Sequence, residues 1–74
     1  MPFTKALEQL QQGKKVVRQS WTSGEQYIIE ITDAQYQGEA VNPYFLIKTD
    51  ETPAFSVFQP TSCDILADDW QLVS

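Results

Sequence analysis

An arginine and a tryptophan lie three residues apart in the stretch Gly13–Trp21, GKKVVRQSW. The guanidinium of Arg18 suits a phosphate group or a carbonyl-rich ring edge, because its N–H donors form a fixed planar fork. An aromatic face such as that of Trp21 can stack on a nucleobase, which contributes about 1–3 kcal/mol per base. These two residue types are therefore suited to a phosphorylated ligand that carries a base.

A second group of candidate residues lies near the C-terminus. Phe58 offers another aromatic face, and the hydroxyls of Thr61 and Ser62 follow it closely. Thr61 to Asp64 match the capping-box pattern, and an apolar pair comes next, which predicts one helical turn with N–H groups that suit an anion. Asp64 either caps this turn or accepts a hydrogen bond from a ribose hydroxyl, and the pattern favours the cap.

The same residues also fit a purely structural role. Trp21 and Phe58 would then pack in the core or in an interface between chains. Arg18 would pair with Glu30 or with an aspartate near the C-terminus. Composition alone favours this structural interpretation over ligand binding.

Catalysis finds little support in the residue types. The chain has no histidine, so the commonest general base is missing and Cys63 has no imidazole to activate it. We expect Cys63 to be a buried or semi-buried structural thiol. Asp68 and Asp69 fit a solvated turn better than a metal site. The sequence therefore predicts a non-enzymatic protein with no catalytic residues, no metal and no cofactor.

Length and charge narrow the class further. The 74 residues predict one domain, 1–74, whose core is marginal because so short a chain buries only about 60% of its surface. One cysteine and no histidine exclude an intrachain disulfide and a Cys/His zinc site, so self-association is the expected source of extra stability. The net charge of −5 argues against binding to nucleic-acid polymers. Without a recognisable signal peptide or membrane span, we expect a cytoplasmic protein, in the host cytosol if a phage encodes it.

The elements that would position these residues follow from periodicity and turn signals. Apolar residues at helical spacing predict a helix from about Thr4 to Gln12, with Thr4 as N-cap and Gly13 as a left-handed stop. Loops are expected at residues 20–25 and 32–42. The predicted strands are 15–19, 27–31 with Tyr27, Ile29 and Ile31 buried, 44–48 as a central strand covered on both faces, 54–58, and 70–73 with Trp70 and Leu72 facing the core. Phe55 and Val57 should share one face of their strand, with Phe58 on the other.

Three stretches of the chain, taken together and in order, resemble one known family. They are TKALEQLQQGKKVVRQSW, PYFLIK and PTSCDILADDWQLV, which cover nearly the whole sequence. They are similar to the Thoeris anti-defence type-two family of small phage and bacterial proteins. The resemblance implies an α+β domain in which an N-terminal helix packs on a strongly bent antiparallel sheet of about five strands, with a short helical turn before the last strand.

The resemblance also implies a function. Members of this family act as sponges that sequester a cyclic nucleotide immune signal, such as glycocyclic ADP-ribose, without cleaving it. Some relatives hold cyclic di- or oligonucleotides at a second site. Members assemble as homo-oligomers, typically tetramers, with pockets between protomers. Applied to this chain, the resemblance implies a ligand site that includes Arg18, Trp21, Thr22, Phe58, Thr61, Ser62 and Asp64.

This sequence departs from the family pattern at several loop positions. Thr22 and Ser23 replace the usual Asn-Gly after Trp21, and Phe58 replaces the usual tryptophan before the late proline. These departures concern the identity of the ligand more than the fold. One alternative is a protein–protein inhibitor or assembly module whose acidic face, formed by Asp50, Glu51, Asp68 and Asp69, docks a basic partner. A weaker alternative is an enzyme that acts on cyclic nucleotides.

Overall fold

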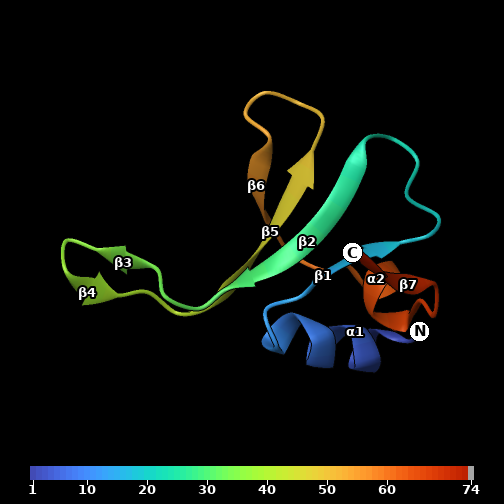
Figure 1. Cartoon of the computed structure of the whole chain (residues 1–74), viewed down its shortest axis with the longest axis horizontal. Helices are drawn as coiled ribbons and strands as arrows, with labels where there is room; N and C mark the ends of the chain where they lie inside the picture. Colours follow the sequence, from blue (N-terminus) through green and yellow to red (C-terminus); the bar gives the residue numbers. More distant parts are fainter. Residues whose placement is uncertain (74) are drawn as a thin grey trace.

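The computed structural model describes residues 1–73. It contains two helices, one before the first strand and one before the last, and a series of short strands (Figure 1). In chain order the elements are α1 (Phe3–Gln11), β1 (Lys15–Arg18), β2 (Glu25–Ile31), β3 (Gln35–Tyr36), β4 (Glu39–Ala40), β5 (Tyr44–Thr49), β6 (Phe55–Phe58), α2 (Ser62–Leu66) and β7 (Trp70–Val73). This is the α+β class expected from the sequence. The predicted boundaries of the domain, 1–74, stay a prediction, and Ser74 lies outside the described residues.

The main sheet has five antiparallel strands in the order β6-β5-β2-β1-β7. Residues 44–48 form an interior strand, β5, as expected, but the expectation that it is covered on both faces was wrong, because all its residues are only half-buried. β5 pairs with β2 on one side and β6 on the other, and β6 is the edge. A register shift between Glu25 and Tyr27 places a bulge in β2. Such bulges increase the local twist of a strand, and β2 curves visibly in Figure 1.

The first helix begins one residue earlier than predicted. Pro2, not Thr4, is the N-cap, because its extended backbone lets its carbonyl accept from the N–H groups of Lys5 and Ala6, both at 3.1 Å. No side chain caps this end. Gly13 stops the helix as expected: it follows the C-cap Gln12, its φ of 82° is left-handed, and the N–H groups of Gly13 and Lys14 donate to the carbonyls of Leu10 and Gln9. This is a Schellman ending, in which glycine carries no Cβ penalty.

The core lies between α1 and one face of the sheet. Its fully buried side chains come from the helix and from β1, β2 and β7, and they are Ala6, Leu10, Val16, Ile28 and Trp70. Burial of each large aliphatic side chain contributes roughly 1.5–3 kcal/mol. The sequence predicted the wrong face of β2: Ile28 is buried against the helix, whereas Tyr27, Ile29 and Ile31 lie on the opposite face and are half-buried. Because β2 carries apolar residues on both faces, the sequence pattern does not show which face packs against the helix.

Two other predictions of burial were wrong. Leu72 pairs opposite Val16, but it belongs to the edge strand β7 and is 52% exposed. Cys63 is exposed on α2, not buried. The prediction for Trp70 is confirmed, since its side chain is only 1% exposed.

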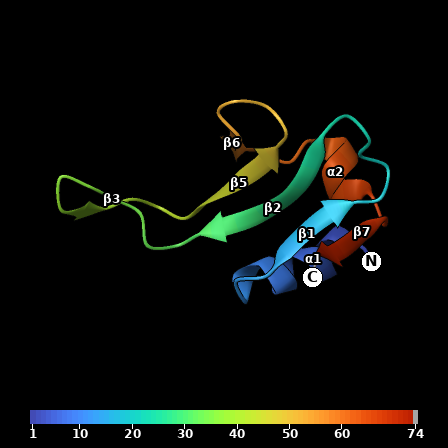
Figure 2. The same ribbon diagram turned by 45° about the horizontal axis from the view of Figure 1, so that its top comes forward.

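Residues 32–42 form a projecting arm instead of an irregular loop. Within it β3 and β4 pair as a short hairpin, with Gln35 opposite Ala40 and Tyr36 opposite Glu39. The turn between them uses positive φ at Gln37 and Gly38, as hairpin turns require. Figures 1 and 2 both show this hairpin extending away from the body of the domain at the far end of β2 and β5. The segment was predicted to be a loop because it contains few apolar residues.

Candidate functional site

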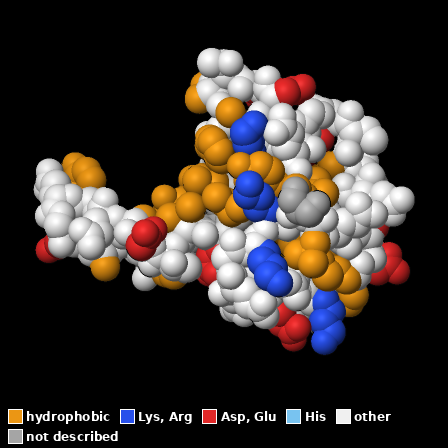
Figure 3. Space-filling view, viewed as in Figure 1, with side chains coloured by type: hydrophobic (Ala, Val, Ile, Leu, Met, Phe, Trp, Pro, Cys, Tyr) orange, Lys and Arg blue, Asp and Glu red, His pale blue; other side chains and the backbone are white. Residues whose placement is uncertain are grey.

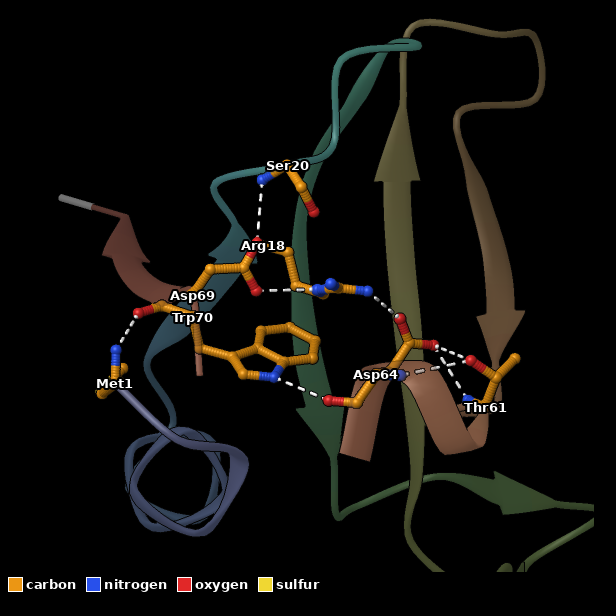
Figure 4. A network of polar contacts seen from close by, with 7 residues as sticks. All are labelled: Met1, Arg18, Ser20, Thr61, Asp64, Asp69 and Trp70. Carbon is orange, nitrogen blue, oxygen red and sulfur yellow. Dashed lines mark hydrogen bonds and ion pairs between the residues drawn. The ribbon is translucent and has the colours of Figure 1, made fainter. Parts of the chain in front are cut away.

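Five of the seven predicted site residues come together at one end of the sheet. They are Arg18 at the end of β1, Trp21 just beyond it, Phe58 at the end of β6, and Thr61 and Asp64 at the start of α2. The fold closes this cluster around Trp70, the first residue of β7, as Figure 4 shows for its polar members. Thr22 and Ser62 are exposed next to it along the chain.

Arg18 is held by two carboxylates. Its Nε donates to Oδ1 of Asp69 at 2.9 Å, and its Nη1 donates to Oδ1 of Asp64 at 3.0 Å (Figure 4). The Asp69 hydrogen bond is the main cause that raises the pKa of Arg18, with Asp64 adding to it. The structural alternative that paired Arg18 with a C-terminal aspartate is thus confirmed for two aspartates, while Glu30 makes no ion pair within residues 1–73. Two of the five N–H groups of the guanidinium are used in these bonds.

Asp64 uses both of its carboxylate oxygens. Oδ1 faces Arg18, and Oδ2 accepts from the backbone N–H of Thr61 at 2.9 Å and from its hydroxyl at 3.0 Å. The Thr61 hydroxyl also accepts from the N–H of Asp64, which completes the predicted capping box. Burial opposes ionisation, but the bonds from Thr61 and Arg18 outweigh it, and the pKa of Asp64 is lowered. The expectation that Asp64 is the cap is confirmed.

Asp69 is a member of the cluster that was not among the predicted ligand-binding residues. It accepts from Arg18 through Oδ1 and from the backbone N–H of Ser20 through Oδ2, at 3.1 Å. The hydrogen bond from Arg18 is the main cause that lowers the pKa of Asp69 to about 2. The sequence suggested an acidic pair in a turn and an aspartate near the C-terminus as a partner of Arg18, without showing which aspartate that would be. The partner of Asp69 follows from the pairing of β1 with β7, which sets Arg18 opposite Trp70.

The aromatic members form a chain of edge contacts. Trp21 meets Phe58 with ring centroids 5.7 Å apart, and Trp70 with centroids 5.4 Å apart, both edge-on. Trp70 also packs on Phe3, and its indole N–H donates to the backbone carbonyl of Asp64 at 3.0 Å. Trp21 and Phe58 are half-buried. They therefore pack against the core while keeping part of each side chain open to solvent.

The charges of the cluster limit what it can bind. One guanidinium faces two carboxylates, so the group is net negative and an additional phosphate near Arg18 would meet repulsion. The ionised carboxylates of Asp64 and Asp69 accept hydrogen bonds, and ribose hydroxyls can donate hydrogen bonds to them. Among residues 1–73, no group of three or more metal-ligating side chains is close enough to hold an ion. The arrangement suits a sugar with a stacked ring better than a bare phosphate.

An open pocket of about 400 Å³ lies elsewhere, at the other end of β1. Gly13, Lys14, Lys15, Leu72 and Val73 line it. None of the predicted site residues contributes to this pocket. It therefore belongs to the junction between α1, β1 and β7 and not to the cluster around Trp70.

The fold and the cluster define a small α+β domain with an aromatic and polar site at one end of its sheet, and no helix within residues 1–73 is long and apolar enough to cross a membrane. The chain belongs to the Tad2-like family: the model of the Thoeris anti-defense 2-like domain matches residues 1–73. Membership supports a role in countering Thoeris defence and suggests that the role is non-catalytic. No curated protein matches the chain.

Proposed function

We propose that this chain is a phage anti-defence sponge, which binds a cyclic nucleotide immune signal and sequesters it without cleaving it. Membership of the Thoeris anti-defense 2-like family carries the proposal, because that role implies contact with a signalling molecule. The ligand would be of the glycocyclic ADP-ribose type, or a cyclic di- or oligonucleotide. The absence of histidine from the sequence favours binding over catalysis.

The cluster around Trp70 is the proposed binding site. Trp21 or Phe58 would stack on the base, because each is half-buried and held in place by an edge contact with the other. The ribose hydroxyls would donate to Asp64, and ribose oxygens would accept from the N–H groups of Arg18 not bound to Asp64 and Asp69. The exposed residues Thr22, Thr61 and Ser62 would complete the contacts, with the hydroxyls of α2 closest to the phosphates.

The sponge is proposed to work in the cytosol of the infected host as a homo-oligomer. The family resemblance implies that this homo-oligomer is a tetramer. Few side chains are fully buried in the domain, and several large apolar ones, including Phe55 and Val57, are exposed. A second chain that covers such residues adds stability that a core of this size does not supply. The acidic-face alternative is weaker, because Asp69 is bound to Arg18 and Ser20 and is not free to dock a partner.

Isothermal titration calorimetry of the purified protein with glycocyclic ADP-ribose and with cyclic dinucleotides tests the sponge. We expect binding, with the ligand recovered intact after heat denaturation. Loss of a stacked base costs about 1–3 kcal/mol, so Trp21→Ala should weaken binding by roughly 5- to 150-fold. Trp21→Phe should weaken it less, and Gln11→Ala, on the exposed side of α1, should leave it unchanged.

Three results would count against this function. No heat of binding with any of these ligands would reject the sponge for them. A chemically altered ligand would indicate an enzyme instead. Wild-type affinity in a folded Trp21→Ala variant would remove the cluster from the site, even if the protein still bound a nucleotide elsewhere.

A further inference from the structure

A tight turn joins the end of β1 to Trp21. The N–H of Trp21 donates to the carbonyl of Arg18 at 3.1 Å, which closes a turn over Arg18, Gln19, Ser20 and Trp21. Trp21 is the last residue of this turn, and the loop beyond it, residues 22–24, leads into β2. The conformation of the turn therefore sets the direction in which the Trp21 side chain leaves the backbone.

Asp69 binds to each of the three residues that precede Trp21 in this turn. Its backbone carbonyl accepts from the N–H of Gln19 at 2.9 Å. Its carboxylate accepts from the N–H of Ser20 through Oδ2 at 3.1 Å and from Nε of Arg18 through Oδ1 at 2.9 Å (Figure 4). A single residue, far away in the sequence, thus holds the turn at three successive positions.

Asp69 is itself held in place. It directly precedes Trp70, whose side chain is 1% exposed and whose backbone N–H donates to the carbonyl of Met1 at 3.1 Å. The register of β1 with β7 sets Arg18 opposite Trp70, which brings Asp69 beside the turn. The hydrogen bond from Arg18 lowers the pKa of Asp69 to about 2, so at neutral pH its carboxylate is ionised and accepts from both of its donors.

Trp21 depends on such support because it belongs to no helix or strand. The apolar side chains that Figure 3 shows gathered over β2 and β5 are oriented by the hydrogen-bonded strands that carry them. The side chain of Trp21, by contrast, is half-buried and meets the rings of Phe58 and Trp70 through edge-on contacts. Without the bonds to Asp69, the turn and the indole ring would be free to adopt other orientations.

We propose that Asp69 is a positioning residue for Trp21, which fixes the turn so that the indole ring has its ligand-stacking orientation before a ligand arrives. This role rests on the proposed function, in which Trp21 stacks on a base. A side chain that is ordered in the free protein loses less conformational freedom when the ligand binds, so the affinity is higher. Asp69 acts through the turn and not by contact with the ligand.

The orientation of Trp21 can be measured without any ligand. Two indole rings whose centroids are 5.4 Å apart, as those of Trp21 and Trp70 are, give a coupled circular dichroism signal that depends on their mutual angle. The spectrum of Trp21→Ala is the reference without coupling. We expect Asp69→Ala to lose most of the coupled signal, and Asp68→Ala, which removes the exposed neighbouring carboxylate, to keep it. Asp69→Asn retains one acceptor oxygen and should give an intermediate spectrum.

Calorimetry with glycocyclic ADP-ribose and with cyclic dinucleotides tests whether this orientation matters for binding. Asp69→Ala should weaken binding by roughly 2- to 12-fold, which corresponds to the cost of immobilising one side chain. The same substitution made in Trp21→Ala should have no further effect, because Asp69 acts through Trp21. Asp68→Ala should bind like the wild type.

An Asp69→Ala variant that keeps the coupled signal would overturn the proposal, since packing alone would then orient Trp21. So would an equal loss of affinity from Asp69→Ala in the wild type and in Trp21→Ala, since Asp69 would then contact the ligand directly. A wild type that binds none of these ligands would reject the sponge, while the ligand-free spectra would still decide whether Asp69 orients Trp21. A cooperative unfolding transition shows that each variant is folded. If Asp69→Ala does not fold, Asp69→Asn, which loses one of the two carboxylate bonds, carries the same comparisons.

Discussion

Asp64 offers the sharpest test of the cluster that joins β1, α2 and β7. Both of its carboxylate oxygens accept hydrogen bonds from groups that cannot reverse their roles: the guanidinium of Arg18 and the backbone N–H of Thr61. In Asp64→Asn, one of these oxygens becomes an NH₂ group. Whichever way the amide is turned, a donor then faces a donor, so one bond is lost and one polar group is left without a partner in a nearly buried place.

The size of the effect follows from those bonds. A hydrogen bond that involves a charged group contributes about 1.5–3 kcal/mol, and a buried donor left unpaired costs about 1–3 kcal/mol. Because these costs overlap, Asp64→Asn should lower the free energy of unfolding by about 2–4 kcal/mol. A domain of this length has roughly 4–11 kcal/mol in total. The midpoint of thermal unfolding should fall by at least about 8 °C.

Urea and thermal unfolding, followed by circular dichroism at one protein concentration, measure this change. Asp68→Asn is the matched control, because Asp68 is exposed, lies four residues along the chain and makes no hydrogen bond or ion pair within residues 1–73. It should alter stability by less than about 0.5 kcal/mol. If the two variants proved equally stable, the cluster would not hold the elements together as its geometry indicates.

Three further outcomes are expected. The pKa values of Asp64 and Asp69 are lowered, that of Asp69 to about 2, so the two carboxylates contribute to stability above pH ~4 and this contribution is lost as the pH falls toward 2. Acid titration of the folded protein should show this loss of stability. The loss should be smaller in Asp64→Asn than in the wild type. Trp70→Phe should lower the free energy of unfolding by about 2–4 kcal/mol, since the carbonyl of Asp64 loses its indole donor and the smaller ring leaves a cavity. A thermal melting curve like that of the wild type would contradict this. Gly24→Ala should also destabilise, because φ is 103° there, a conformation that residues with a Cβ rarely adopt. Unchanged stability to urea would refute the reasoning.

Local signals in the sequence predicted local structure well. Gly13 marked the end of α1, and the pattern from Thr61 to Asp64 marked the capping box at the start of α2. Hydrophobic periodicity and turn signals also predicted the first helix and the five strands of the main sheet. These features depend on backbone conformations and hydrogen bonds between near neighbours, which residue type alone constrains strongly.

Long-range features were harder to predict. β2 and β5 carry apolar residues on both faces, so periodicity did not show that Ile28 faces α1 while Tyr27 lies on the opposite face. The edge position of β7 exposes Leu72, although its pattern resembles that of a buried strand. The hairpin within the arm gave no apolar signal, because its strands are too short to bury anything.

For the candidate site, the sequence by itself determined which groups are available: an arginine, two tryptophans, a capping box, an excess of carboxylates and no histidine. Only the tertiary structure decided how they are used. The pairing of β1 with β7 brings Arg18 to Asp69, and the position of α2 brings it to Asp64. A guanidinium interacts with whichever carboxylates the fold brings within about 3 Å, and residues 46 and 51 positions apart meet only when the sheet closes.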